Sequence, residues 1–119
     1  LHKALAIDLK HLGKDHPSVS STYMNIGLVH QEKAEYDKAL EFYHKSLDID
    51  LKKLGKDHPS VALTYMNIGT VHQEKAEYDK ALEFLHKALA IDLKHRGKDH
   101  RSVACTYMNI GIVHQEKAE

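Results

Sequence analysis

The chain has 119 residues, of which 42% are hydrophobic and 29% are charged, and its 17 basic side chains balance 17 acidic ones. This composition indicates a folded domain and argues against a nucleic-acid or anionic-membrane surface, each of which needs clustered Lys and Arg. The single cysteine, Cys105, excludes an intrachain disulfide and favours a reducing, cytoplasmic environment. We expect no signal peptide and no membrane span, because no long apolar run is present.

The first two predicted helices cover residues 1–12 and 17–33, where apolar residues recur at helical spacing. In the second of them, Tyr23, Ile26 and His30 fall three and four residues apart, which places them on one face. We expect this face to pack against a partner helix. His30 and its copy in the next repeat are therefore predicted to lie in the seam between paired helices.

The second predicted helix begins at Pro17, whose missing N–H is not needed in a first turn. Either Asp15 or His16 is expected at the cap. Aspartate is the better acceptor, whereas a proline at the first position favours the histidine. A second type of helix follows at 37–54, and Gly55 then supplies a residue that can adopt the left-handed conformation that ends helices.

The remaining predicted helices cover 59–75, 79–96 and 101–117, and no alternating strand pattern is present. They repeat the earlier patterns because the hexapeptide TYMNIG recurs three times at a period of 42 residues. Such a period is typical of an array in which helix pairs stack along one axis. We therefore predict one all-α domain over residues 1–119, with repeat copies at 1–42, 43–84 and 85–119.

Gly27 lies inside the predicted helix 17–33, where glycine costs about 1 kcal/mol relative to alanine. The same glycine occurs in all three copies of the hexapeptide. We infer that it allows the paired helix to approach closely, while Tyr23 and Ile26 fill the rest of the seam.

The repeat resembles the tetratricopeptide repeat at the positions that this family uses for packing. That family places a large, an aliphatic and a small residue on the first helix, an aromatic residue at the turn and an alanine on the second helix. The residues that match these roles are Tyr23, Ile26, Gly27, Tyr36 and Ala39, with copies at Tyr65, Ile68, Gly69, Tyr78 and Ala81. The longer period and the linker Leu-Gly-Lys-Asp-His-Pro are similar to kinesin light chain repeats. The resemblance implies a right-handed superhelical solenoid of about six helices in antiparallel pairs, which acts as a non-enzymatic protein-interaction scaffold.

Only two columns of the repeat differ in all three copies, and they lie seven residues apart on one stripe of the first helix. The resemblance implies that this helix lines a concave groove, where the family's asparagine bonds the backbone of a partner peptide. An amide offers two donors and an acceptor, and methionine adds adaptable apolar contact. Neutral drift of surface positions is the alternative explanation of the variation. The predicted groove residues are Ser21, Met24, Asn25, Leu28, Gln31, Leu63, Met66, Asn67, Thr70, Gln73, Cys105, Met108, Asn109 and Ile112.

A second hypothesis is that the segment is structural and associates with copies of itself. The last predicted helix is expected to expose the face that a second-type helix covers in the other copies, and residues 1–12 carry the complementary pattern. A head-to-tail contact of this kind joins different surfaces and builds open chains. The predicted end-to-end interface consists of Leu5, Leu9, Leu12, Tyr107, Ile110 and His114.

The eleven histidines are mostly repeat copies, so duplication explains their number without a metal site. The close i, i+4 pairing that zinc-binding helices use is missing. No phosphate-binding loop or nucleophile elbow is evident. We therefore predict no metal, no other cofactor and no enzymatic activity, and we expect a protein or peptide partner rather than nucleic acid or membrane. The two weak candidate clusters are His11 with Asp15 and His16, and His95 with Asp99 and His100.

Overall fold

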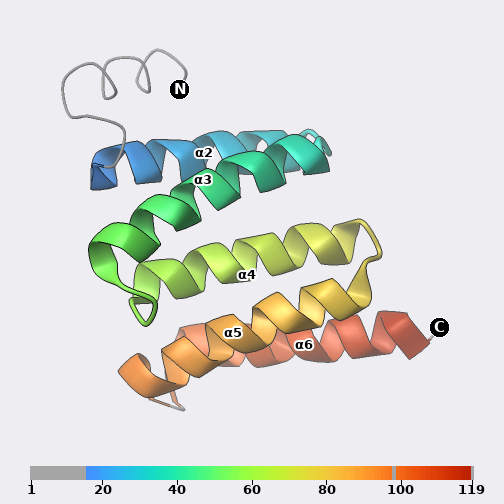
Figure 1. Cartoon of the computed structure of the whole chain (residues 1–119). Coiled ribbons are helices and arrows are strands. Elements are labelled where there is room, and N and C mark those ends of the chain that lie inside the picture. The colour runs from blue at the N-terminus through green and yellow to red at the C-terminus, as the bar shows by residue number, and fades with distance from the viewer. Residues whose placement is uncertain (1–15, 98, 119) are drawn as a thin grey trace. The chain divides into compact units, whose positions relative to one another are not determined.

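A computed structural model describes residues 16–97 and 99–118, and it contains five α-helices and no strand in these ranges (Figure 1). The helix predicted at 1–12 lies outside the described residues. The chain divides into two compact units, Leu1–Lys56 and Asp57–Glu119. The predicted all-α, repeat-type fold is confirmed.

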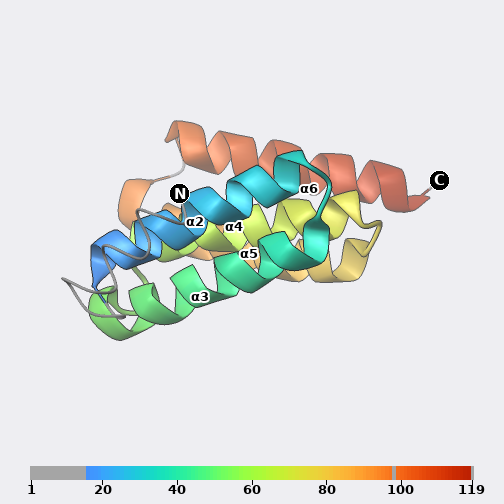
Figure 2. The same ribbon diagram turned by 90° about the horizontal axis from the view of Figure 1, so that it is seen from above.

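The first unit contains a hairpin of two helices, α2 (Pro17–Glu32) and α3 (Tyr36–Leu54) (Figure 1, Figure 2). Their apolar faces meet, so that Ile26 and Tyr43 are both buried. The helices approach closely at Gly27, where an added Cβ would lie 2.7 Å from two ring carbons of Tyr43. The expected role of this glycine is thereby confirmed.

The second unit contains α4 (Pro59–Glu74), α5 (Tyr78–Arg96) and α6 (Arg101–Ala118). Figure 1 and Figure 2 show α5 packed along both α4 and α6. The five described helices begin and end within one residue of the predicted bounds. A core cluster joins α5 and α6, and it contains Ala81, Leu85, Leu89, Val103, Ile110 and Val113.

Three first-type helices start with a histidine whose Nδ1 accepts a hydrogen bond from the backbone N–H two residues later. The N···N distances are 3.1 Å at His16, 3.0 Å at His58 and 3.0 Å at His100. An accepting Nδ1 requires that a neutral imidazole carries its proton on Nε2. The alternative left open for the first of these caps is settled in favour of His16.

The turns within the helix pairs place alanine in the left-handed region, with φ of 61° at Ala34 and 62° at Ala76. This conformation brings Cβ too close to the following carbonyl oxygen and costs roughly 1–2 kcal/mol for a residue other than glycine. The backbone N–H groups of Glu35 and Glu77 then close the turns by donating, each over 2.8 Å, to the carbonyl oxygens of the histidines in the last turn of each first helix.

Those histidines, His30 and His72, lie in the seams as predicted. The ring of His72 is buried and stacks on Phe84, with ring centres 5.6 Å apart and an interplanar angle of 8°. Its Nδ1 lies 2.8 Å from Oε1 of Glu77. The hydrogen bond with His72 holds the pKa of Glu77 below its usual range, against the opposing effect of burial. His30 repeats both contacts in the first unit.

Candidate functional site

The predicted groove residues of α2 lie on the surface of the first unit or near it. Ser21, Asn25 and Leu28 are exposed, whereas Met24 and Gln31 are half-buried. The Oε1 atom of Gln31 accepts a hydrogen bond of 2.6 Å from the Tyr43 hydroxyl. Because this bond ties Gln31 to the buried ring, part of its hydrogen-bonding capacity already serves the packing of the helix pair.

On α4, the predicted residues range from exposed to half-buried. Leu63 is 48% exposed. Thr70 donates a hydrogen bond of 2.8 Å to the carbonyl oxygen of Asn67, so its hydroxyl serves its own helix. The other members, which are all half-buried, are Met66, Asn67 and Gln73.

On α6, Cys105, Met108 and Ile112 are exposed and Asn109 is half-buried. Met108, at 65%, has the largest exposed fraction among the exposed large hydrophobic residues.

Two side-chain contacts link α4 and α6, each between a predicted groove residue of α4 and a different residue of α6. The Gln73 amide nitrogen donates to Oε1 of Glu116 over 2.7 Å, and the Thr106 hydroxyl lies 3.6 Å from the Met66 sulfur. The second unit therefore brings the predicted residues of α4 and α6 together on neighbouring helices, whereas those of α2 belong to the first unit.

The predicted end-to-end residues are placed only in part, since Leu5, Leu9 and Leu12 lie outside the described residues. Tyr107 is 53% exposed and His114 is exposed. Ile110 differs from the expectation: it is 9% exposed and belongs to the core cluster of the second unit. It lies on the same helix stripe as Val103, Thr106 and Val113, whose side chains are also buried.

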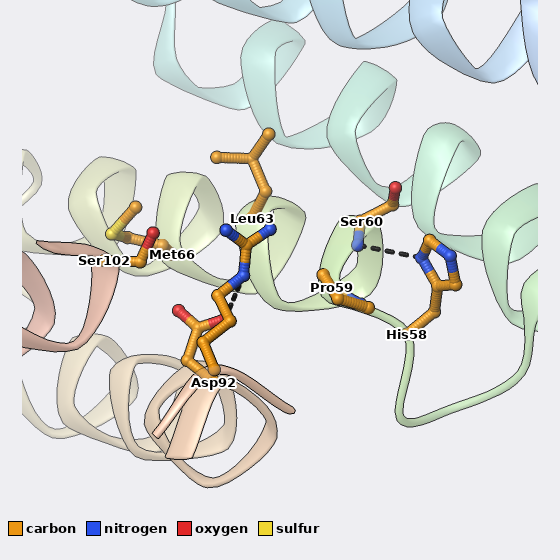
Figure 3. A pocket seen from close by; sticks show the side chains of 8 residues that line it. His58, Pro59, Ser60, Leu63, Met66, Asp92 and Ser102 are labelled. Carbon is orange, nitrogen blue, oxygen red and sulfur yellow. Dashed lines mark hydrogen bonds and ion pairs between the residues drawn. The ribbon is translucent and has the colours of Figure 1, made fainter. Parts of the chain in front are cut away.

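A cavity of about 480 Å³ lies between α4, α5 and α6, and sequence analysis did not identify it (Figure 3). One of its lining residues is Asp92, which is only 5% exposed. Oδ1 of Asp92 lies 3.7 Å from Nε of Arg96 in an ion pair. Burial raises the pKa of Asp92, an effect that the charge of Arg96 partly offsets. The cavity is lined by His58, Pro59, Ser60, Leu63, Met66, Asp92, Arg96 and Ser102.

The corresponding acid of the first unit, Asp50, has a different environment. Its Oδ1 accepts a hydrogen bond of 2.8 Å from the Ser20 hydroxyl, which also lies 2.8 Å from Oγ of Ser46. Both serines are alanine in the second unit, at Ala62 and Ala88. Comparing these columns of the repeat is the one signal in the sequence that could have indicated the cavity.

Within residues 16–97 and 99–118, no cluster of three His, Cys, Asp or Glu side chains is arranged to hold a metal ion. The first weak candidate, with His11 and Asp15, lies outside these ranges. None of the helices in the described part of the chain is long and apolar enough to span a membrane.

The tetratricopeptide repeat family matches the sequence at residues 1–52, 18–94 and 60–119, which together cover the whole chain. A comparison with curated protein sequences found no match.

Two solved structures share the fold over 98% of this chain at 22% identity. One is BtubC (BKLC) from P. vanneervenii, with a TM-score of 0.90. The other is a Podosopora anserina protein, assigned as a kinesin light chain, with nearly identical TPR-like repeats and a TM-score of 0.86. The chain covers 47% and 56% of these two proteins, so it spans about half their length.

Proposed function

The chain belongs to the tetratricopeptide repeat family, and from this premise we propose that its first-type helices bind an extended or helical peptide of a partner protein. Tetratricopeptide repeats generally mediate protein–protein interactions. The observation that carries the proposal is the pairing of α4 and α6, which presents Leu63, Met108 and Ile112 to solvent while the opposite faces pack on α5.

Asn67 has a central role in this proposal, because its amide can both donate to and accept from a peptide backbone. Half-buried beside the exposed apolar residues, it would fix the register of a peptide that they hold. The neighbouring Met66 offers a flexible, polarisable contact that adapts to different side chains.

The experiment is a peptide-library screen against the whole chain, followed by binding measurements with the selected peptides. Asn67→Ala should weaken binding at least about tenfold, the effect of losing roughly 1.4 kcal/mol of hydrogen bonding. His86→Ala is the matched control, because His86 is an exposed side chain on α5. Unchanged affinity of Asn67→Ala, with helicity retained, would contradict the proposal.

A second candidate function, self-association, is favoured by the surroundings of Gly111. A Cβ added at Gly69 would lie 3.0 Å from Leu85, whereas a Cβ at Gly111 would meet no atom within 4 Å. In the repeat, the column of Tyr43 and Leu85 corresponds to Leu1. The segment 1–12 of a second copy would therefore bring a leucine to this open glycine.

Sedimentation velocity from micromolar to near-millimolar protein tests the second candidate. Head-to-tail association predicts that the sedimentation coefficient rises with protein concentration and passes beyond the value of a dimer, because such a contact does not close on itself. Gly111→Ala should shift this growth to higher concentrations by filling the space that Leu1 would occupy. A concentration-independent monomer would exclude self-association of this chain.

A further inference from the structure

The cavity between α4, α5 and α6 contains a carboxylate that the chain itself satisfies poorly. Among the described residues, Asp92 has an ion pair with Arg96 at 3.7 Å and no hydrogen bond. A carboxylate has about four positions for accepting hydrogen bonds. No buried side-chain oxygen of the described residues lacks a partner, so the oxygens of Asp92 that accept no hydrogen bond remain accessible from the cavity. Its side chain lines the open cavity, so a donor that enters from outside can reach it (Figure 3).

Comparison of the two units shows that the acid at this position of the repeat can accept a hydrogen bond from the chain itself. In the first unit the Ser20 hydroxyl donates to Asp50 over 2.8 Å. In the second unit the same column is Ala62, so this donor is missing while the acid is retained. The repeat fold therefore does not require an aspartate without hydrogen-bond donors at this position. In the second unit, Asp92 lacks such a donor and lines a cavity.

Arg96 is the only cation paired with Asp92 in the described residues, and it is held loosely. Its side chain is 39% exposed, and its counterpart in the first unit is Leu54. Nη1 of Arg96 lies 3.3 Å from Nε2 of His100. Since Nδ1 of neutral His100 accepts from a backbone N–H, its Nε2 carries a proton, and two donors then face each other. That contact cannot anchor the guanidinium.

We propose that this cavity is a subsite for a basic side chain, arginine or lysine, of the partner peptide, and that the peptide displaces Arg96 from Asp92. The proposal rests on the proposed function, because it assumes that α4 and α6 bind a peptide. A guanidinium from outside can approach Asp92 with two parallel N–H donors, a geometry that the 3.7 Å contact of Arg96 lacks. Leu63 and Met66 line the cavity and offer apolar surface to the methylene stem of the entering side chain.

The probe is a fluorescein-labelled peptide, Ala-Ala-Arg-Ala-Ala, and its control replaces the arginine by citrulline, which has a similar shape but no charge. Fluorescence anisotropy with the whole chain measures both affinities. The arginine peptide should bind roughly tenfold tighter or more than the citrulline peptide, as expected for a hydrogen bond to a charged group. Arg96→Leu, which copies Leu54, should tighten binding of the arginine peptide only.

Two variants test whether Asp92 is the receptor. Asp92→Asn should abolish the preference for arginine over citrulline. Ala62→Ser combined with Ala88→Ser introduces the hydroxyls of the first unit and should weaken the arginine peptide by giving Asp92 internal donors. Circular dichroism establishes that each variant is folded. Equal binding of both peptides to wild type and Arg96→Leu, or an arginine preference that survives in Asp92→Asn, would overturn the proposal.

The outcomes separate this inference from the proposed function. Library peptides that lose affinity on Asn67→Ala but not on Asp92→Asn would support the peptide-binding face and overturn the basic subsite. An arginine peptide that depends on Asp92 but not on Asn67 would support the subsite and contradict the role given to Asn67. Absence of binding by every peptide would overturn both.

Discussion

Gly27 packs so closely against Tyr43 that no larger residue fits there. A methyl group on the glycine would lie 2.7 Å from Cδ1 and Cε1 of the tyrosine ring. Tyr43 is fully buried, and its hydroxyl is bonded to Gln31. The ring therefore has little freedom to move away. At Gly69 the neighbour is the flexible side chain of Leu85, and at Gly111 the space is open.

Alanine substitution at these glycines should therefore give three different results. Gly27→Ala should destabilise the chain by about 1–3 kcal/mol, the usual cost of overpacking. Gly69→Ala should cost less, because Leu85 can move by the few tenths of an ångström that are needed. Gly111→Ala should stabilise the chain by up to about 1 kcal/mol through helix propensity alone. Urea unfolding followed by circular dichroism measures all three, and a similar shift at each site would contradict the packing argument.

Local patterns made the helices predictable. Gly55 follows the end of α3, and Pro59 is the first residue of α4. Such residues, together with the helical spacing of apolar residues, define where each helix begins and ends. Ile110 is buried rather than exposed as expected, because it belongs to two overlapping helix stripes, and only packing against α5 decides between them. Helix spacing does not predict the cavity, because Asp92 from α5 and Leu63 from α4 meet only in the folded chain. From spacing alone, Asp92 resembles an ordinary solvated acid.

Ser20→Ala should destabilise the first unit. The Ser20 hydroxyl contacts both Asp50 and Ser46 at 2.8 Å, and all three residues are buried. Removing the hydroxyl takes a donor from a buried carboxylate, which costs about 1–3 kcal/mol. Ser18→Ala, at an exposed position of the same helix, is the matched control. Thermal melting of the two variants should differ by several degrees, and equal melting temperatures would show that the hydroxyl is dispensable.

Low pH should destabilise the two turns in which a histidine side chain is hydrogen-bonded to a glutamate side chain. The hydrogen bonds with His30 and His72 hold the pKa values of Glu35 and Glu77 below the usual range. A carboxyl whose folded pKa is lowered contributes stability above its unfolded pKa, and this contribution is lost as the pH falls through the folded pKa. The variant Glu35→Gln/Glu77→Gln should therefore lose less stability than wild type between about pH 5 and pH 3. Glu83→Gln, at an exposed position, is the control and should follow the wild-type curve.

Asp92 should show the opposite dependence on pH. Burial raises its pKa, so the folded chain holds this proton more tightly than the unfolded chain does. Its favourable contribution is therefore complete below the unfolded pKa and is lost as the pH rises through the raised folded pKa. Asp92→Asn keeps the shape of the side chain and removes the charge, so it should be more stable than wild type at neutral pH.

The measurement is urea unfolding of wild type and Asp92→Asn from about pH 3 to pH 7, a range that begins below the ordinary aspartate pKa. The stability difference should be small at the acid end and should grow in favour of Asp92→Asn as the pH rises. Asp48→Asn, at an exposed position on α3, controls for the loss of one negative charge. A difference that stays constant with pH, or a variant that is less stable at pH 7, would mean that Arg96 already compensates the buried charge.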